Sequence, residues 1–465
     1  MKTPRIMLTT GILCAIAAGA SDPKLKWEYQ ALSNLYAPPL VADMHHAPGL
    51  ETIIADSEAK TLRCIDARGE QLWEQRAGWT KRLISAPALS SFVEGAPRLL
   101  VVGNADGSLT CLRAGDGLVL WRKPVGAVEW GGALWADITG DGVEEIIYGT
   151  KYDGVLAIDR DGELLWRYRG EEDTALEVQC PLAAADIDGD GRAEILGCAK
   201  EGPFCLTADG TLRWRQTTAF DFVSGPVVTA LEGDGAHSLI AASRDDNTLW
   251  CFDAATGEER WRAALFASVD TTTGSSIAVG DIDRNLYDPP ALRKAFAAKE
   301  IVIGDMQGTL YAFEASGLLR WTFTTAMPGT IAPTLGDVDG DGAVEVLAAA
   351  ADHALYCLNS RGEPKWRFRT NLRLIHSATI ADVNADGKTE VLVCGGDHSL
   401  RCLTLDGAHE PYLLPWPARR GDALARGSPS RPSPGARAGL RCRLFRQRRG
   451  FRGRGRALGG SFRGF

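Results

Sequence analysis

The stretch Asp186-Ile-Asp188-Gly-Asp190-Gly-Arg-Ala-Glu194, with Leu212-Arg-Trp214 shortly after it, shows the phrase that recurs along this chain. Short apolar runs surround the acidic part, and an Asp-Gly pair of the kind that turns β-hairpins precedes the tryptophan. One repeat therefore predicts four short strands with an acidic loop after the first. The predicted strands are Pro181–Ile187, Glu194–Ala199, Phe204–Thr207 and Thr211–Arg215.

Tryptophans mark the period of the repeat. They stand at Trp27, Trp73, Trp121, Trp166, Trp214, Trp261, Trp321 and Trp366, a spacing of 45 to 48 residues with one interval of 60. A period in the forties with several short strands per unit predicts an all-β fold, a β-propeller of four-stranded antiparallel blades. Eight tryptophans predict eight blades. The interval of 60 contains an insertion near Leu286–Lys299, whose composition predicts a short helix after Pro289-Pro290.

The two ends of the repeat array predict how the ring closes. The last unit, about Leu374–Leu405, has three predicted strands and no tryptophan at the right spacing. Trp27-Glu-Tyr29, near the N-terminus, matches the fourth-strand phrase Trp166-Arg-Tyr168. We therefore expect the N-terminal strand to complete the last blade, which removes the free sheet edges that promote association.

Four acidic loops are the candidate metal sites. Each has oxygen-bearing side chains at positions 1, 3, 5 and 9 and a glycine at position 6, an arrangement that suits calcium, which binds six or more oxygens. Several uncompensated carboxylates in one loop would repel one another. The alternative is that Asp, Asn and Gly only build turns. The sequence predicts about four structural calcium sites, formed by Asp137, Thr139, Asp141 and Glu145; by Asp186, Asp188, Asp190 and Glu194; by Asp337, Asp339, Asp341 and Glu345; and by Asp382, Asn384, Asp386 and Glu390.

The eleven cysteines predict packing rather than disulfides. Equivalent positions in neighbouring blades lie too far apart for the narrow Cα separation that a disulfide requires. Buried, small, apolar cysteine is therefore favoured over a disulfide framework or a catalytic thiol. Six cysteines occupy one equivalent position: Cys64, Cys111, Cys205, Cys251, Cys357 and Cys402.

The N-terminus predicts export. Lys2 and Arg5 precede the apolar stretch Ile6–Ala18, and small residues lead to a cleavage site after Ala20, so residues 1–20 read as a signal peptide. No other stretch has the length and apolar character of a membrane-spanning helix. We expect a secreted, periplasmic or cell-surface monomer with its β-propeller at residues 21–417.

The C-terminal residues 418–465 differ in composition from the rest. Residues 419–465 hold 14 arginines, no lysine and one acid, whereas the whole chain has a net charge of −8. Abundant Arg, Gly, Ser and Pro with few aliphatic residues cannot build a core, so the segment is expected to be disordered. A frameshifted reading of a GC-rich gene, or an inert disordered tail, is favoured over a functional basic arm. No nucleic-acid partner is expected for an exported acidic propeller.

Two motifs resemble known repeat families. Cys251-Phe-Asp-Ala-Ala-Thr-Gly257-Glu-Glu-Arg-Trp261 resembles the tryptophan-docking repeat of pyrroloquinoline-quinone-type eight-bladed propellers. The acidic loops resemble the FG-GAP/VCBS repeats of integrin-like propellers. The first resemblance implies dehydrogenases among the relatives, which hold the quinone with a vicinal cysteine pair. No adjacent cysteines occur in this sequence, so no quinone is expected.

The function favoured by the sequence is a non-enzymatic binding or interaction scaffold for a protein or glycan. Three alternatives stay open: a calcium-dependent polysaccharide lyase, a quinone-dependent dehydrogenase, and an outer-membrane assembly scaffold. The sequence marks no catalytic residue, and His353 and His398 fill equivalent turn positions of the repeat.

Overall fold

The computed structural model describes residues 22–409 except 46–48, 84, 94, 127–130, 171–175, 179, 223, 234, 270–276, 284–297 and 375. The chain divides into two units, Met1–Ser430 and Arg431–Phe465, and all described residues belong to the first. The predicted signal peptide, the predicted helix after Pro289-Pro290 and the arginine-rich segment lie outside the described residues.

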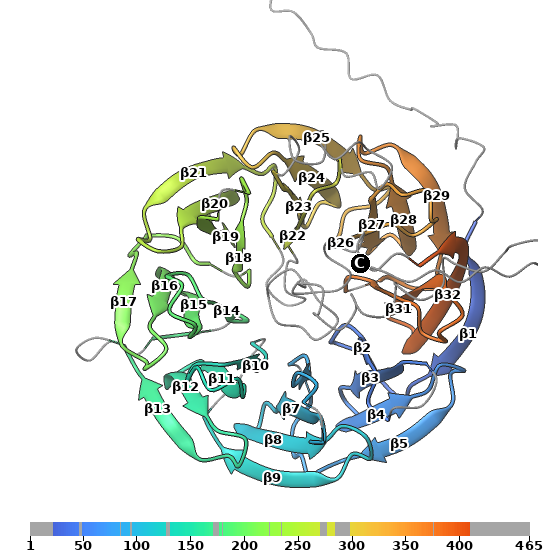
Figure 1. Ribbon diagram of the computed structural model, residues 1–465. Coiled ribbons are helices and arrows are strands. Elements are labelled where there is room, and N and C mark those ends of the chain that lie inside the picture. Colours follow the sequence, from blue (N-terminus) through green and yellow to red (C-terminus); the bar gives the residue numbers. More distant parts are fainter. Residues whose placement is uncertain are drawn as a thin grey trace, which may run out of the picture. The chain divides into compact units, whose positions relative to one another are not determined.

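The described residues form eight four-stranded antiparallel sheets and no helix, as the repeat predicts, and Figure 1 shows them as blades around a central axis. The blades are, in order: blade 1, β2 (Leu40–Ala42), β3 (Glu51–Asp56), β4 (Thr61–Ile65), β5 (Gln71–Gln75); blade 2, β6 (Ala88–Leu89), β7 (Leu99–Gly103), β8 (Ser108–Arg113), β9 (Val119–Pro124); blade 3, β10 (Leu134–Ala136), β11 (Glu145–Thr150), β12 (Gly154–Ile158), β13 (Leu164–Tyr168); blade 4, β14 (Ala183–Ala185), β15 (Glu194–Ala199), β16 (Gly202–Leu206), β17 (Leu212–Arg215); blade 5, β18 (Val227–Ala230), β19 (His237–Ser243), β20 (Thr248–Asp253), β21 (Glu259–Ala264); blade 6, β22 (Ile277–Gly280), β23 (Glu300–Gly304), β24 (Thr309–Phe313), β25 (Leu319–Thr324); blade 7, β26 (Ile331–Gly336), β27 (Glu345–Ala350), β28 (Ala354–Leu358), β29 (Pro364–Arg369); and blade 8, β30 (Thr379–Ala381), β31 (Lys388–Cys394), β32 (Ser399–Ala408) and β1 (Lys24–Gln30).

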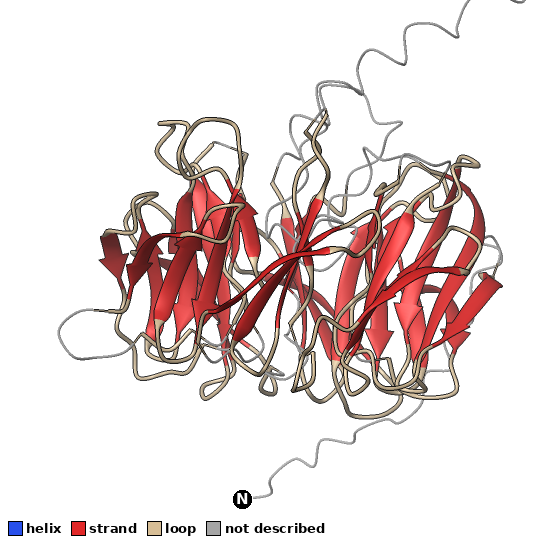
Figure 2. Ribbon diagram, turned by 90° about the horizontal axis from the view of Figure 1, so that it is seen from below, coloured by secondary structure: helices blue, strands red, loops and turns tan. Residues whose placement is uncertain are grey.

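Burial follows the position of a strand in its blade. The second and third strands, such as β27 and β28, are buried along their whole length, so their sequences are continuous apolar runs. The fourth strands form the outer rim and alternate between exposed and partly buried residues, as in β9. Figure 2 shows the strands running between two sets of loops. The acidic loops join the first strand of a blade to the second.

The predicted closure is confirmed. β1 pairs antiparallel with β32, with Trp27 opposite Cys402, so the N-terminal strand is the fourth strand of blade 8. The first strand of blade 4 is shorter than predicted, ending at Ala185, because both carboxylate oxygens of Asp186 accept hydrogen bonds from the loop that follows.

The recurring cysteines lie against the tryptophans within each blade. Cys251 on β20 stands opposite Trp261 on β21, and the same pairing recurs in five other blades. Alanine takes the cysteine position in blades 3 and 6. The residue opposite the tryptophan is thus small in all eight blades, and it is 0% exposed in each of them. All nine cysteines in the described part of the chain are buried thiols outside any disulfide, as predicted.

Seven of the eight tryptophans join their blade to the next one. Trp214 of blade 4, for example, donates a hydrogen bond from Nε1 to the carbonyl of Ala254 in blade 5 at 3.0 Å. The seven donors are Trp27, Trp73, Trp121, Trp166, Trp214, Trp261 and Trp321. Trp366 is different. Its Nε1 is buried without a hydrogen-bond partner among the described residues, because blade 8 has no hairpin between its third and fourth strands.

Glycine is required where each of these seven indoles meets the next blade. Gly257 has φ +76°, and a Cβ there would lie 2.6 Å from the Trp214 ring, whereas Gly235 in the same blade has φ +90° and open space around it. Both alanine substitutions place a side chain in the left-handed region, which costs about 1–2 kcal/mol. We expect Gly257→Ala to cost about 1–3 kcal/mol more than Gly235→Ala, because only the first overpacks the indole. Urea unfolding of the two variants measures this difference, and equal losses would contradict the docking role.

Candidate metal centre

The acidic loops share one framework of hydrogen bonds. In blade 7 the Glu345 Oε2 atom, at position 9, accepts a hydrogen bond from the backbone N–H of Val338, at position 2, at 3.0 Å. The carboxylate of Asp337, at position 1, accepts from the backbone N–H groups of Gly340 and Gly342. Blades 3, 4 and 8 repeat this framework with Glu145, Glu194 and Glu390 at position 9. The carboxylates at positions 1 and 9 therefore fold the loop, as the turn interpretation predicts.

Blade 7 carries the more buried acidic cluster. Carboxylate oxygens of Asp337, Asp339 and Glu345 lie within 4.8 Å of one another, and Asp337 and Glu345 are at most 1% exposed. The Lys365 Nζ atom lies among these carboxylates, 2.6 Å from Asp339 Oδ2 and 2.9 Å from Glu345 Oε1. It also lies 3.0 Å from Asp341 Oδ2. The cluster thus already holds one positive charge, from the fourth strand of its own blade.

Blade 4 carries the second cluster, nearer to solvent. Oxygens of Asp186, Asp188 and Glu194 lie within 4.8 Å of one another, and both aspartates are exposed. Arg213 lies 2.7 Å from Asp188 Oδ2. Asp190, the remaining predicted ligand, accepts a hydrogen bond from the backbone N–H of Arg192.

The other two predicted loops hold their acids less closely. In blade 3, Asp137, Asp141 and Glu145 accept backbone hydrogen bonds, and Thr139 is exposed. In blade 8, Asn384 Nδ2 donates to Asp386, Asp382 accepts from Gly387, and Lys26 Nζ lies 2.8 Å from Glu390 Oε1. Among the described residues, clusters of three acids whose oxygens lie within 4.8 Å of one another occur in blades 4 and 7.

The cations in these loops were missed by sequence reasoning. Lys26, Arg213 and Lys365 each precede the tryptophan of a fourth strand directly. Arg320 stands at the same position in blade 6 and bonds Asp283 and Glu300. In blades 4 and 7 the signal was present in the sequence, because the basic residue before the tryptophan follows an acid of the loop by 25 and 24 residues.

Burial changes the acidity of the loops. Burial raises the pKa of the Glu345 carboxyl to about 8, and Asp339 adds to the shift while Lys365 opposes it. Burial also raises the pKa values of Glu145, Glu194 and Glu390. These carboxyls hold a proton more tightly than exposed glutamates do, so a nearby cation stabilises their ionised form.

Glu300 gives a pH-dependent prediction. It is 7% exposed, and burial raises its pKa to about 7, with Asp283 adding to the shift and Arg320 opposing it. At a pH between the ordinary pKa of 4.5 and the folded-state pKa of about 7, Glu300 holds a proton in the folded chain and has released it in the unfolded chain. The free energy of unfolding therefore falls as the pH rises through this range. We expect a loss of up to about 2 kcal/mol from pH 5 to pH 7, which Glu300→Gln removes. Urea unfolding at both pH values tests this, with the exposed Glu314→Gln as control. An unchanged slope in Glu300→Gln would contradict it.

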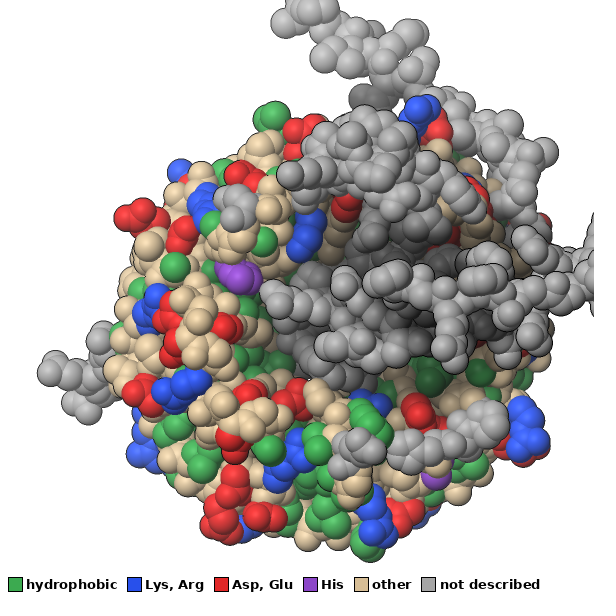
Figure 3. All heavy atoms as spheres, in the orientation of Figure 1, with side chains coloured by type: hydrophobic (Ala, Val, Ile, Leu, Met, Phe, Trp, Pro, Cys, Tyr) green, Lys and Arg blue, Asp and Glu red, His purple; other side chains and the backbone are tan. Residues whose placement is uncertain are grey.

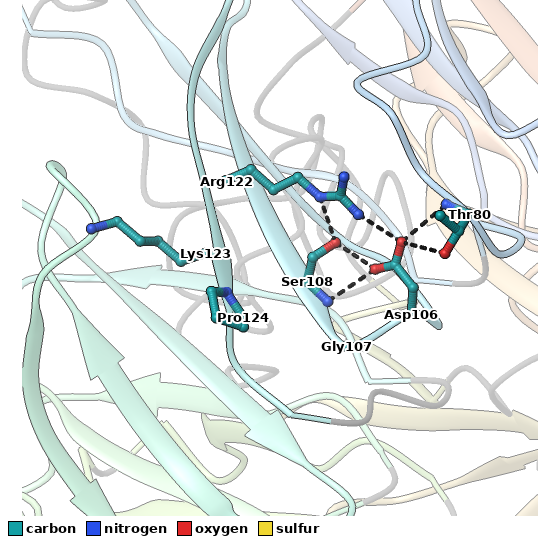
Figure 4. A pocket seen from close by; sticks show the side chains of 7 residues that line it. All are labelled: Thr80, Asp106, Gly107, Ser108, Arg122, Lys123 and Pro124. Carbon is teal, nitrogen blue, oxygen red and sulfur yellow. Dashed lines mark hydrogen bonds and ion pairs between the residues drawn. The ribbon is translucent and has the colours of Figure 1, made fainter.

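A shallow pocket of about 370 Å³ lies in blade 2, lined in part by Thr80, Asp106, Ser108 and Arg122 (Figure 4). The Asp106 carboxylate accepts hydrogen bonds from Thr80, Ser108 and Arg122. Burial alone would raise the pKa of Asp106, but these contacts lower it below its usual range. Because the polar groups of the pocket bond one another, we interpret the Asp106–Arg122 ion pair as structural. On the face seen in Figure 3, acidic and basic side chains are interspersed over the blades.

Two known protein families match parts of this chain. The family described as outer membrane protein assembly factor BamB matches residues 5–144, 58–193 and 199–282, together more than half of the chain. The family described as the lambda-carrageenase β-propeller domain matches residues 334–411. A search of the curated proteins found no match.

Solved structures show the same fold at low identity. BamB from Moraxella catarrhalis is 16% identical with a TM-score of 0.57, covering 84% of this chain and 100% of that chain. The Vibrio cholerae biofilm matrix protein Bap1 is 13% identical with a TM-score of 0.60, covering 86% and 93%. Quinohemoprotein alcohol dehydrogenase from Comamonas testosteroni is 13% identical with a TM-score of 0.58, covering 84% and 77%. No helix among the described residues has the length and apolarity needed to cross a membrane. With more than half of its length matched, the chain belongs to the family described as outer membrane protein assembly factor BamB.

Proposed function

We propose that this protein is a non-enzymatic scaffold of the cell envelope that binds a protein partner during outer-membrane assembly. The family match over more than half of the chain carries this proposal. The repeat supports it, because the tryptophans, cysteines and glycines that recur serve the contacts within and between blades. The proposal includes a signal peptide at residues 1–20, which would deliver the chain to the envelope. It also includes a disordered tail at residues 418–465 that has no part in this function.

We further propose that the acidic loops are FG-GAP/VCBS-type loops whose cation is calcium. Carboxylate oxygens are the ligands that this hard cation prefers. The clusters at Asp186 and Asp337 bring three acids together, which supports the proposal. The glutamates at position 9 are buried, so a cation there would stabilise the fold.

Glycan binding is the second candidate, and one observation favours it. Residues 334–411, which include the acidic loops of blades 7 and 8, match the lambda-carrageenase β-propeller domain. A glycan-binding protein or a calcium-dependent lyase would use these blades. The quinone-dependent dehydrogenase has no comparable support beyond the shared fold.

Site-specific photocrosslinking in the cell envelope separates these functions. The crosslinker is placed at exposed positions on different blades, such as Phe92 in the loop of blade 2 and Phe266 after blade 5. The proposed function predicts a crosslink from one region of the propeller to an outer-membrane assembly protein, with the other region as internal control. Purified protein is also given carrageenan, pectin, and alcohols with added quinone. Polysaccharide cleavage or quinone-dependent oxidation would overturn the scaffold function.

A further inference from the structure

In four blades the residue before the docking tryptophan is basic and faces the acidic loop of its own blade, whereas Arg260 of blade 5 pairs with Asp253 on β20. In blades 4, 6, 7 and 8 this residue is Arg213, Arg320, Lys365 or Lys26, and each lies within 3.0 Å of a loop carboxylate. The contacts go to equivalent places. Arg213, Arg320 and Lys365 reach position 3, and Arg320, Lys365 and Lys26 reach the buried glutamate at the start of the second strand.

Lys365 occupies the place a metal ion would take. Its Nζ atom lies 2.6 to 3.0 Å from oxygens of Asp339, Asp341 and Glu345, which are the acids at positions 3, 5 and 9. A calcium ion bound by the same oxygens would lie about 2.3–2.6 Å from each of them. The ammonium and the ion cannot share this position. Because Lys365 is held on the fourth strand of the same blade, it competes at a high effective concentration.

Blade 3 lacks this cation. Leu165 stands before its tryptophan and is 45% exposed. In the part of the chain that the structure describes, Asp137, Asp141 and Glu145 have no ion pair, and their hydrogen bonds come from backbone N–H groups. Leucine also precedes the tryptophan in blades 1 and 2, at Leu72 and Leu120, where the loops lack the full acidic set.

We propose that, in a blade with a full acidic loop, the residue before the docking tryptophan decides which cation the loop binds first. A lysine or arginine is a built-in counter-ion that competes with calcium, so Lys365 is the resident cation of the Asp337 loop. A leucine leaves the Asp137 loop to recruit a divalent cation from solution. The metal part of this inference rests on the calcium proposal above, whereas the counter-ion part does not. The sequence alone favours the Asp337 loop as a metal site, because it has acids at positions 1, 3, 5 and 9, whereas the Asp137 loop has a threonine at position 3. The proposal reverses this order, since Lys365 makes the Asp337 loop bind metal less readily.

A reciprocal exchange tests the proposal. Lys365→Leu gives blade 7 the residue of blade 3, and Leu165→Lys gives blade 3 the residue of blade 7. Bound calcium per chain is counted after equilibrium dialysis, and thermal unfolding is followed in calcium and in chelator. We expect Lys365→Leu to bind about one more ion than wild type and Leu165→Lys about one fewer. The melting temperature of Lys365→Leu should rise with calcium by at least about 3 °C more than that of wild type.

The outcomes separate the two proposals. Equal calcium counts and equal shifts in all three proteins would overturn the counter-ion competition and leave the calcium proposal standing. Calcium binding by none of them would overturn both. Lys365→Arg keeps the charge and should behave as wild type, which distinguishes loss of the cation from loss of packing. If Lys365→Leu does not fold, Lys365→Gln provides the same comparison without the charge.

Discussion

A chain that begins at Ser33 instead of Asp22 is expected to lose its cooperative unfolding transition and to self-associate. This truncation removes β1, the fourth strand of blade 8, and leaves β32 as an open sheet edge. It also removes Trp27, whose indole joins blade 8 to blade 1 through the carbonyl of Ala67 at 2.9 Å. Losing the packing of one such indole costs about 3–5 kcal/mol. The melting temperature should fall by at least about 10 °C.

A chain that begins at Lys24 provides the control, because it keeps all of β1. Thermal unfolding and size-exclusion chromatography of the two truncations distinguish closure from a simple shortening effect. If the chain from Ser33 remains monomeric and has the same melting temperature as the chain from Lys24, the N-terminal strand does not close the ring.

Trp366→Ala is expected to cost about 3–5 kcal/mol of folding free energy, the range for truncating a large buried aromatic side chain. Trp366 is 1% exposed and packs between blades 7 and 8. The hydrogen bonding of the indole N–H groups predicts that tryptophan-to-phenylalanine substitutions differ between two blades. Trp366 Nε1 has no acceptor among the described residues, whereas Trp261 Nε1 donates to the carbonyl of Ala315 at 2.9 Å.

The phenylalanine variants test this difference. Trp261→Phe leaves the carbonyl of Ala315 unpaired and should cost about 1–3 kcal/mol through that hydrogen bond, beyond the loss of ring area. Trp366→Phe loses ring area alone. Urea unfolding of both variants gives the comparison. A cost at position 366 that exceeds the loss expected from its buried ring area would mean that Trp366 does have an acceptor.

The fold was predictable because its signals repeat. Eight tryptophans gave the number of blades, and the resemblance of Trp27-Glu-Tyr29 to the other fourth strands gave the closure. The short first strands were less predictable, because carboxylates such as that of Asp186 draw the end of the strand into the loop.

The candidate site was predictable only in part. The spacing of the acids placed them in one loop, but spacing alone does not show what lies opposite the loop. Lys365 reaches Asp341 across 24 residues, and only the register of the blade brings the two together. The unpaired indole of Trp366 likewise follows from the missing hairpin of blade 8 rather than from any local sequence signal.

Calcium binding by the wild-type chain, measured by equilibrium dialysis from micromolar to millimolar free calcium, tests the central claim most directly. The claim is that the acidic loops are cation sites that differ in whether the chain supplies its own cation. It predicts that about one ion per chain binds first, at the Asp137 loop, and that the loops facing Lys26, Arg213 and Lys365 fill only at higher calcium. About four equivalent ions, or none at all, would contradict it.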